Sequence, residues 1–186
     1  MKTLKLNDIK NSKYDDFSII NINTNLSLKY KNEDFVIDTE TLFKNCDIYQ
    51  QNNIPKIKMI FNNESNDLLE TIKLLYDKIS YVIKKNDDII LSHIINPIYK
   101  SNNNKEMLFS IINTKTIIKN IENDDLMKLS ELNDKTFDIY PILYCLNMNL
   151  YDDKLYINFS FHTIFIKLIE KHNIDINYDK IKKLMK

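Results

Sequence analysis

Several residue types are missing from this sequence. Its 186 residues include no glycine, tryptophan, alanine or arginine, so lysine is the basic residue everywhere except at three histidines. Glycine, alanine and arginine have GC-rich codons, whereas the abundant isoleucine, asparagine, lysine and tyrosine have AT-rich ones. Mutational bias in a very AT-rich genome explains this pattern, and such genomes occur in some insect viruses, certain protozoa and some bacteria. The use of lysine in place of arginine therefore indicates the genome and not the function.

The absence of glycine excludes whole classes of site. Loops that hold phosphate groups need glycine, because the backbone must approach the ligand closely and adopt positive φ. A P-loop, a Rossmann fingerprint and a kinase-type glycine loop are therefore excluded. Turns must rely on Asn and Asp, which tolerate the left-handed region better than other residues. We expect such turns in NNES (62–65), IKKNDD (83–88), KSNNNKE (100–106) and LYDDK (150–154).

The net charge, the cysteines and the length of the hydrophobic runs further limit the functions and locations to be expected. The formal net charge is +0, which argues against nucleic-acid binding through bulk charge but leaves room for a local lysine-lined groove. Cys46 and Cys145 lack metal-ligand spacing. No secretory signal is visible, and no apolar run reaches the roughly 18 residues of a membrane-spanning helix. We expect an intracellular, reducing setting with free cysteines and no membrane partner.

The first third of the chain predicts β-strands. Short runs of β-branched and aromatic residues alternate with Asn and Asp clusters. The expected strands are 17–22, 26–31, 34–38, 41–49 and 54–61. In the last of these, Ile57 and Met59 point to one side, while Lys56 and Lys58 point to the other.

The hydrophobic period then changes to that of a helix. Apolar residues from 68 to 83 recur at helical spacing and form one stripe, so we predict a helix over 65–85. Ser65 or Asn66 can cap its start, and Asp67 and Glu70 favour the dipole of the first turn.

The second half returns to strands. We expect a strand over 87–100 interrupted by Pro97, with His93 as a core histidine, and a strand over 107–113 paired with it. Residues 116–121 fit either a strand or a helix, and 123–132 predict a short helix. A long hairpin over 137–166 turns at 151–153, followed by a basic tail.

Strand runs with inserted helices, and no regular alternation, indicate a sheet-rich α+β fold. We predict an OB-like barrel with an inserted long helix and extra strands. The chain should form a single domain over 1–186, with an OB-like core at about 14–166 and a C-terminal basic tail at 167–186.

No catalytic, metal or cofactor site is expected, so we predict that the protein is not an enzyme. The histidines are not clustered at ligand spacing. Acidic pairs such as Asp87 with Asp88 lie in turns, where carboxylates are solvated and poorly suited to acid–base catalysis. Cys145 lies in an apolar strand, which is typical of an inert core thiol.

Lysines alternate with aromatic residues along the presumed strands. Single-strand binding needs cations that follow the phosphates and flat rings on which bases stack. The same alternation also occurs in ordinary strands, with rings inward and lysines outward. The candidate nucleic-acid-binding residues are Lys29, Tyr30, Lys31, Phe43, Lys44, Tyr49, Lys56, Lys58, Tyr99, Lys100 and Tyr156.

Two stretches resemble the poxvirus family of single-stranded-DNA-binding proteins. LLETIKLLYDKISYVIKK (68–85) is similar to that family's mid-chain helix. IYPILYCLNMNLYDDKLYINFSFHTIFIK (139–167) is similar to its late hairpin, with matches at Ile139, Pro141, Ile142, Lys154, Ile157 and Phe159. The resemblance implies an OB-like fold and an insect-poxvirus-like source. Unlike that family, which tends to end in an acidic tail that contacts replication partners, this chain ends in the basic IKKLMK.

Two functions remain open. The first is sequence-independent, non-enzymatic binding of single-stranded DNA in viral DNA replication or repair, in the host cytoplasm, with self-association possible. The alternative is a viral host-interaction domain that binds a protein and no nucleic acid, which the net neutrality favours. The rings on the outer face of the late hairpin, such as Tyr156 and His162, fit base stacking, packing under the tail or a dimer contact equally well.

Overall fold

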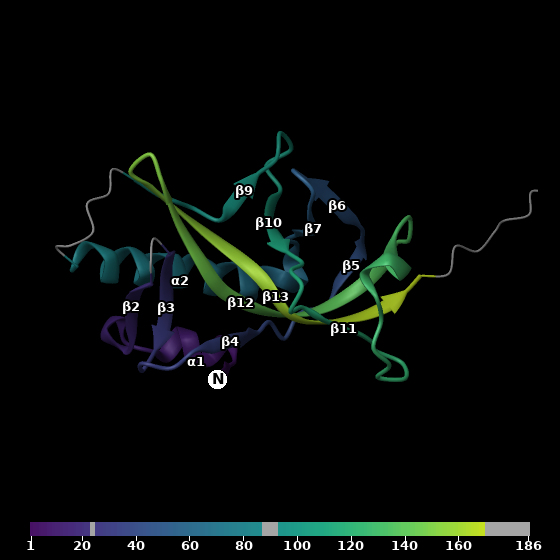
Figure 1. The fold of residues 1–186 in the computed structure, drawn as a ribbon, viewed down its shortest axis with the longest axis horizontal. Coiled ribbons are helices and arrows are strands. Elements are labelled where there is room, and N and C mark those ends of the chain that lie inside the picture. Colours follow the sequence, from purple (N-terminus) through teal and green to yellow (C-terminus); the bar gives the residue numbers. More distant parts are fainter. Residues whose placement is uncertain (23–24, 87–92, 170–186) are drawn as a thin grey trace, which may run out of the picture.

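A long β-hairpin runs through the molecule, and other strands pair with both of its edges (Figure 1). The structure is a computed structural model that describes residues 1–22, 25–86 and 93–169. The hairpin consists of β12 (Phe137–Tyr151) and β13 (Lys154–Leu168), which pair antiparallel from Phe137↔Leu168 to Tyr151↔Lys154. The predicted hairpin and its turn are therefore confirmed.

The other strands pair with the two edges of this hairpin. On the β12 side lie β3 (Asn25–Tyr30), β4 (Phe35–Asp38) and β5 (Phe43–Cys46), with β2 (Phe17–Ile22) beside β3 and β1 (Lys2–Leu4) beside β4. On the β13 side lie β8 (His93–Ile95), β10 (Glu106–Ile111) and β11 (Ile117–Asn120). Beyond β10 follow β7 (Ile54–Ile60), β6 (Ile48–Gln51) and β9 (Ile98–Lys100).

Five of these strands form a ring. β5 pairs with β12, β12 with β13, β13 with β10, and β10 with β7. β5 and β7 then lie against each other, and the ring of Phe43 packs on that of Phe61 with centroids 5.8 Å apart. Such a five-stranded, partly open barrel is the form that OB-like folds take. The predicted sheet-rich α+β class with an inserted helix and extra strands is confirmed.

The long helix α2 (Asn66–Lys84) is inserted between β7 and β8 and agrees with the prediction over 65–85. Ser65 is its N-cap residue, and one face of the helix buries Leu68, Ile72, Leu75 and Ile79 in the core. The short α1 (Leu6–Asn11) packs beside α2, and the sequence analysis did not anticipate it. Short 3-10 turns complete the elements: η1 (Tyr14–Asp16), η2 (Asn63–Ser65) and η3 (Leu129–Leu132).

The turns use Asn and Asp as predicted. Among the described residues, eleven non-glycine residues have positive φ, and nine of them are Asn or Asp. The two-residue turn between β6 and β7 is an example, with φ of 52° at Asn52 and 61° at Asn53. These small polar residues tolerate the left-handed region, so they substitute for glycine in tight hairpins.

Three local predictions were wrong. Residues 123–132 do not form a helix, because the backbone N–H of Met127 donates to the carbonyl of Ile118 and holds the segment against β11; only η3 is helical there. The expected strand over 41–49 is divided into β5 and β6, with Asn45 at a φ of 55°. His93 is exposed at the start of β8 and is not a core histidine.

Of the remaining local predictions, one open choice is now decided, one pairing is confirmed, and two fall partly outside the described residues. Residues 117–120 are the strand β11, which settles the choice between strand and helix in favour of the strand. The predicted pairing across the 101–105 turn is confirmed, since Tyr99 lies opposite Met107. Positions 87–92 of the expected 87–100 strand, and most of the basic tail, lie outside the described residues.

Candidate nucleic-acid interface

Four antiparallel strands, in the order β9, β10, β7 and β6, present one face to solvent (Figure 1). Because side chains alternate along a strand, Ile57, Met59 and Leu108 point into the core, where each is at most 1% exposed. The intervening residues point outward. We call this outer surface of β9, β10, β7 and β6 the open face.

Three aromatic rings lie in contact across the open face. Phe109 of β10 is at the centre, with its ring centroid 6.0 Å from that of Tyr49 on β6 and 5.6 Å from that of Tyr99 on β9. Tyr49 and Tyr99 are 46% and 49% exposed, whereas Phe109 is half-buried between them. We call these three residues the ring row. With Gln51 and Lys56 they line a shallow cavity of about 150 Å³.

Two lysines of β7 lie between the rings. The register places Lys58 opposite Phe109 and Lys56 opposite Tyr49. The ammonium group of Lys56 donates to the side-chain oxygen of Gln51 at 2.9 Å. Lys58 is exposed and forms no ion pair with any residue that the structure describes.

A third lysine, Lys100, lies at the end of β9 opposite Glu106. Glu106 forms its ion pair with Lys73 of α2, at 3.2 Å, and not with Lys100. Because side chains alternate along β9, Lys100 points to the opposite side of the sheet from Tyr99, so the open face carries two lysines, Lys56 and Lys58. Two cations and three rings therefore share this face, and they are the two ingredients that single-strand binding requires.

The structure places the first group of predicted residues elsewhere. Tyr30 is only 6% exposed and packs on Phe17 with centroids 5.2 Å apart, because β3 turns this side chain into the core. Lys29 forms an ion pair with Asp34 at 2.5 Å, and Lys31 one with Asp16 at 3.9 Å. A sealed ring cannot stack on a base, so we leave β3 out of the interface.

The remaining predicted residues are also separate from the ring row. Phe43 is 4% exposed in the contact between β5 and β7, and Lys44 lies 3.8 Å from Glu64. Lys44 nevertheless shares a second cavity, of about 220 Å³, with Lys58. Tyr156 is half-buried on β13, beside β8, and no ring contact joins it to another described aromatic residue.

Sequence reasoning missed the central residue of the site. Phe109 lies in the predicted strand 107–113, but no lysine is next to it in the sequence, so the search for alternating lysine and aromatic residues passed over it. The alternation of that strand was the available signal. Leu108 and Ser110 are buried, which leaves Met107, Phe109 and Ile111 on the open face.

Nothing in the described residues adds reactive chemistry to this face. They contain no group of three side chains that could hold a metal ion. Burial raises the pKa of the Cys145 thiol to about 12 and, with help from Asp138 and Asp47, that of Cys46 to about 12 as well. Both thiols are thus protonated and poorly nucleophilic at neutral pH. No helix in the described part of the chain is long and apolar enough to cross a membrane.

Comparison with known proteins gives structural similarity only. No protein-family model and no curated protein matches the chain. Its fold is similar to that of a solved single-stranded DNA-binding protein from bacteriophage Enc34, at 8% identity and a TM-score of 0.45, covering 88% of this chain and 98% of that one. The same phage protein in complex with ssDNA gives 8% identity and a TM-score of 0.46, covering 83% and 97%. At this level of similarity, the side chains of the site have to carry any functional conclusion.

Proposed function

We propose that this protein binds single-stranded DNA without reading its sequence, and that it is not an enzyme. One observation carries the proposal: Tyr49, Phe109 and Tyr99 form a row on the open face, with unpaired or weakly held lysines directly beside them.

The physical basis is base stacking combined with phosphate contact. Each base stacked on an aromatic ring contributes about 1–3 kcal/mol, and every base has a flat face, so the gain does not depend on sequence. Duplex DNA hides those faces inside its own stack. A row of rings on an open sheet therefore selects single strands, while Lys56 and Lys58 attract the phosphates between successive bases.

Fluorescence polarisation with labelled oligo-dT tests this proposal. We expect Tyr49→Ala and Tyr99→Ala each to weaken binding by roughly fivefold to a hundredfold, the loss expected for one stacked base. Tyr151→Ala is the matched control, because Tyr151 is 68% exposed at the tip of the β12–β13 hairpin, outside the open face. An absence of saturable binding by the unmodified protein at low salt would end the proposal.

The setting that we propose is viral DNA replication or repair in the host cytoplasm. The resemblance of 68–85 and 139–167 to poxvirus single-stranded-DNA-binding proteins supports it, and so does the AT-rich composition. We expect a tagged chain to gather at cytoplasmic DNA-replication sites in infected cells. A diffuse distribution throughout infection would contradict the setting without affecting the binding activity.

A protein-binding role is the second candidate. The open face also exposes Ile54 (43%) and Ile60 (41%), and apolar side chains of this kind suit a protein partner. Capture of one host protein from lysate, unaffected by nuclease and lost in a Tyr99→Ala variant, would favour this role over DNA binding.

A further inference from the structure

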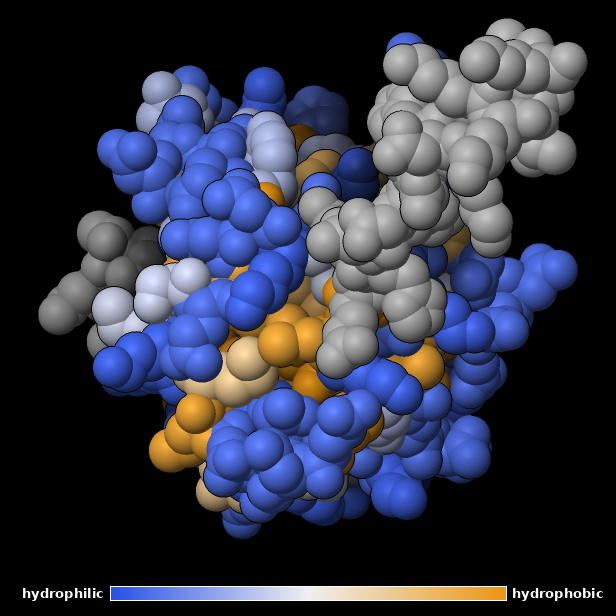
Figure 2. Space-filling model, turned by 90° about the vertical axis from the view of Figure 1, so that its right-hand side faces the viewer, coloured by the Kyte–Doolittle hydropathy of each residue, from blue (hydrophilic) through white to orange (hydrophobic). Residues whose placement is uncertain are grey.

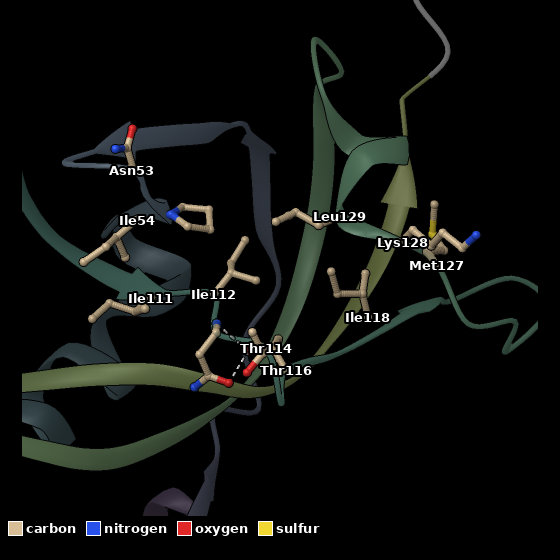
Figure 3. Close-up of a pocket in the computed structure, with 12 residues that line it drawn as sticks. Asn53, Ile54, Ile111, Ile112, Thr114, Thr116, Ile118, Met127, Lys128 and Leu129 are labelled. Atoms are coloured by element: carbon tan, nitrogen blue, oxygen red, sulfur yellow. Dashed lines mark hydrogen bonds between the residues drawn. The ribbon is translucent and has the colours of Figure 1, made fainter.

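A groove opens at one end of the ring row. It has a volume of about 590 Å³ and lies between the start of β7, the end of β10, β11 and the segment that leads into η3. In Figure 3, Ile54 and Ile111 stand on one side of the groove, and Leu129 and Ile118 on the other. Figure 2 looks onto the end of the molecule that carries β6 and β11, where hydrophobic side chains gather in a hollow ringed by hydrophilic ones.

The groove is continuous with the open face. Ile54 and Ile111 belong to both, because they are the next outward-facing residues after Lys56 on β7 and Phe109 on β10. The register places Ile111 directly opposite Lys56, and Ile54 opposite Gln51, which borders the ring row. A strand that lies on the ring row and continues along β7 towards Asn53 therefore enters the groove.

The lining suits a nucleobase joined to a phosphate backbone. Aliphatic side chains form the walls, and polar ones lie at the rim: Asn53, Asn113, Thr114, Thr116 and Lys128. None of the lining residues is acidic, and the nearby carboxylate of Glu131 is engaged by the backbone N–H of Lys128 at 2.8 Å. The amide of Asn53 can pair with the polar edge of a base while the walls cover its faces. The amide of Asn113 can still donate, although its oxygen already accepts from the backbone N–H of Lys115 at 2.8 Å.

We propose that this groove binds the nucleotide that follows those stacked on the ring row, as part of the same single strand. The inference rests on the proposed function. An apolar anchor from a protein partner would also fit the aliphatic walls. However, the continuity with the lysine-bearing face and a lining without acidic residues favour a polyanion. The groove thereby extends the DNA path beyond the three rings and lengthens the binding site.

Two substitutions test the groove with oligo-dT of about 4 and about 12 nucleotides, which bracket the site sizes of such folds. Thr114→Glu adds a carboxylate at the exposed rim, and Leu129→Glu adds one to the wall. We expect both to weaken binding of the longer oligomer at least about fivefold and to leave the shorter one unaffected, since the ring row is intact.

Leu126→Glu is the matched control. It introduces the same charge in the same segment, but Leu126 is 75% exposed and does not line the groove. Thr114→Glu keeps the test valid if Leu129→Glu fails to fold, because Thr114 is an exposed turn residue. If the longer oligomer binds the groove variants as tightly as the Leu126→Glu protein, the groove is not on the DNA path. If the unmodified protein binds neither oligomer, the proposed function itself has failed.

Discussion

At the scale of single residues, the surroundings of each lysine and ring decide its role. Lys29 and Lys58 both sit on strands and look equivalent in the sequence. Lys29 is held by Asp34, whereas Lys58 has no acidic partner among the residues of the described structure. Exposed ion pairs contribute little to stability, but they compete with phosphate for the cation. Lys58 is therefore the better placed of the two for contact with DNA.

The two cysteines give a prediction at this scale. Burial raises the thiol pKa of both Cys46 and Cys145 from 9.0 to about 12, so neither should react with an alkylating reagent at mildly alkaline pH until the protein unfolds. The unfolded chain releases these protons first as pH rises. The thiols therefore stabilise the fold below pH 9.0, and this contribution is lost progressively up to about 12.

Mass spectrometry after iodoacetamide treatment, with and without denaturant, checks the thiol reactivity. Urea unfolding at several alkaline pH values, repeated with Cys46→Ser and Cys145→Ser variants, checks the pH dependence. Rapid labelling of Cys145 in the folded protein would contradict its burial.

At the scale of elements, a buried lysine of α2 holds the end of α1. Lys78 of α2 is 1% exposed, and its ammonium group donates to the carbonyls of Ile9 at 2.7 Å and Ser12 at 2.6 Å, and to the hydroxyl of Ser12. These bonds satisfy carbonyls at the end of a six-residue helix that is too short to be stable alone. Burial lowers the pKa of Lys78, and nearby Asp16 opposes the shift.

Replacing Lys78 should release α1. We expect Lys78→Ala to lower the free energy of unfolding by about 2–4 kcal/mol, through a cavity and the loss of the donor to the Ser12 carbonyl. Lys78→Met keeps most of the volume and should cost less, since it also removes a buried charge. Urea unfolding measures the stabilities, and hydrogen exchange measures the loosening of Leu6–Asn11. Both variants should bind oligo-dT normally, because Lys78 is outside the open face. Unchanged amide protection of α1 in Lys78→Met would contradict the role of Lys78.

At the scale of the whole molecule, the even balance of charge makes binding depend on a local arrangement. The formal net charge is +0, so DNA is attracted only where lysines gather without acids, as on the open face. The two lysines there, Lys56 and Lys58, imply a slope of log affinity against log salt of about −1.4, from roughly −0.7 per phosphate contacted. A much steeper slope would show that lysines elsewhere take part.

Charge reversal tests the same point. Lys56→Glu combined with Lys58→Glu should weaken binding and bring the slope close to zero, because both phosphate contacts of the open face are lost. The control combines Lys13→Glu with Lys84→Glu, two exposed lysines beside η1 and at the end of α2. Because Coulomb effects fade beyond about 10 Å at moderate salt, this equal change in net charge should matter less. Equal losses in the two proteins would remove β7 from the site.

The local sequence pattern by itself determined much of the secondary structure of this protein. The period of the apolar residues determined α2 and most of the strands, because burying one stripe or one face is a local constraint. It also assigned Lys56 and Lys58 correctly to the outside of β7 and placed the hairpin turn at 151–153. The Asn and Asp clusters, which take the place of glycine, also predicted positions at which the chain turns.

Only the tertiary structure decided which rings and lysines meet. Tyr49 is far from Tyr99 and Phe109 in the sequence, and the three rings come together because β6, β7, β10 and β9 pair in one order and register. The pairing of β3 and β5 with β12 instead seals Tyr30 and Phe43 in the core, although their sequence surroundings look alike. Whether a side chain points outward or inward follows from the alternation of its own strand. Its neighbours, however, come from other strands, and a short stretch of sequence does not specify which distant strand will pair with it.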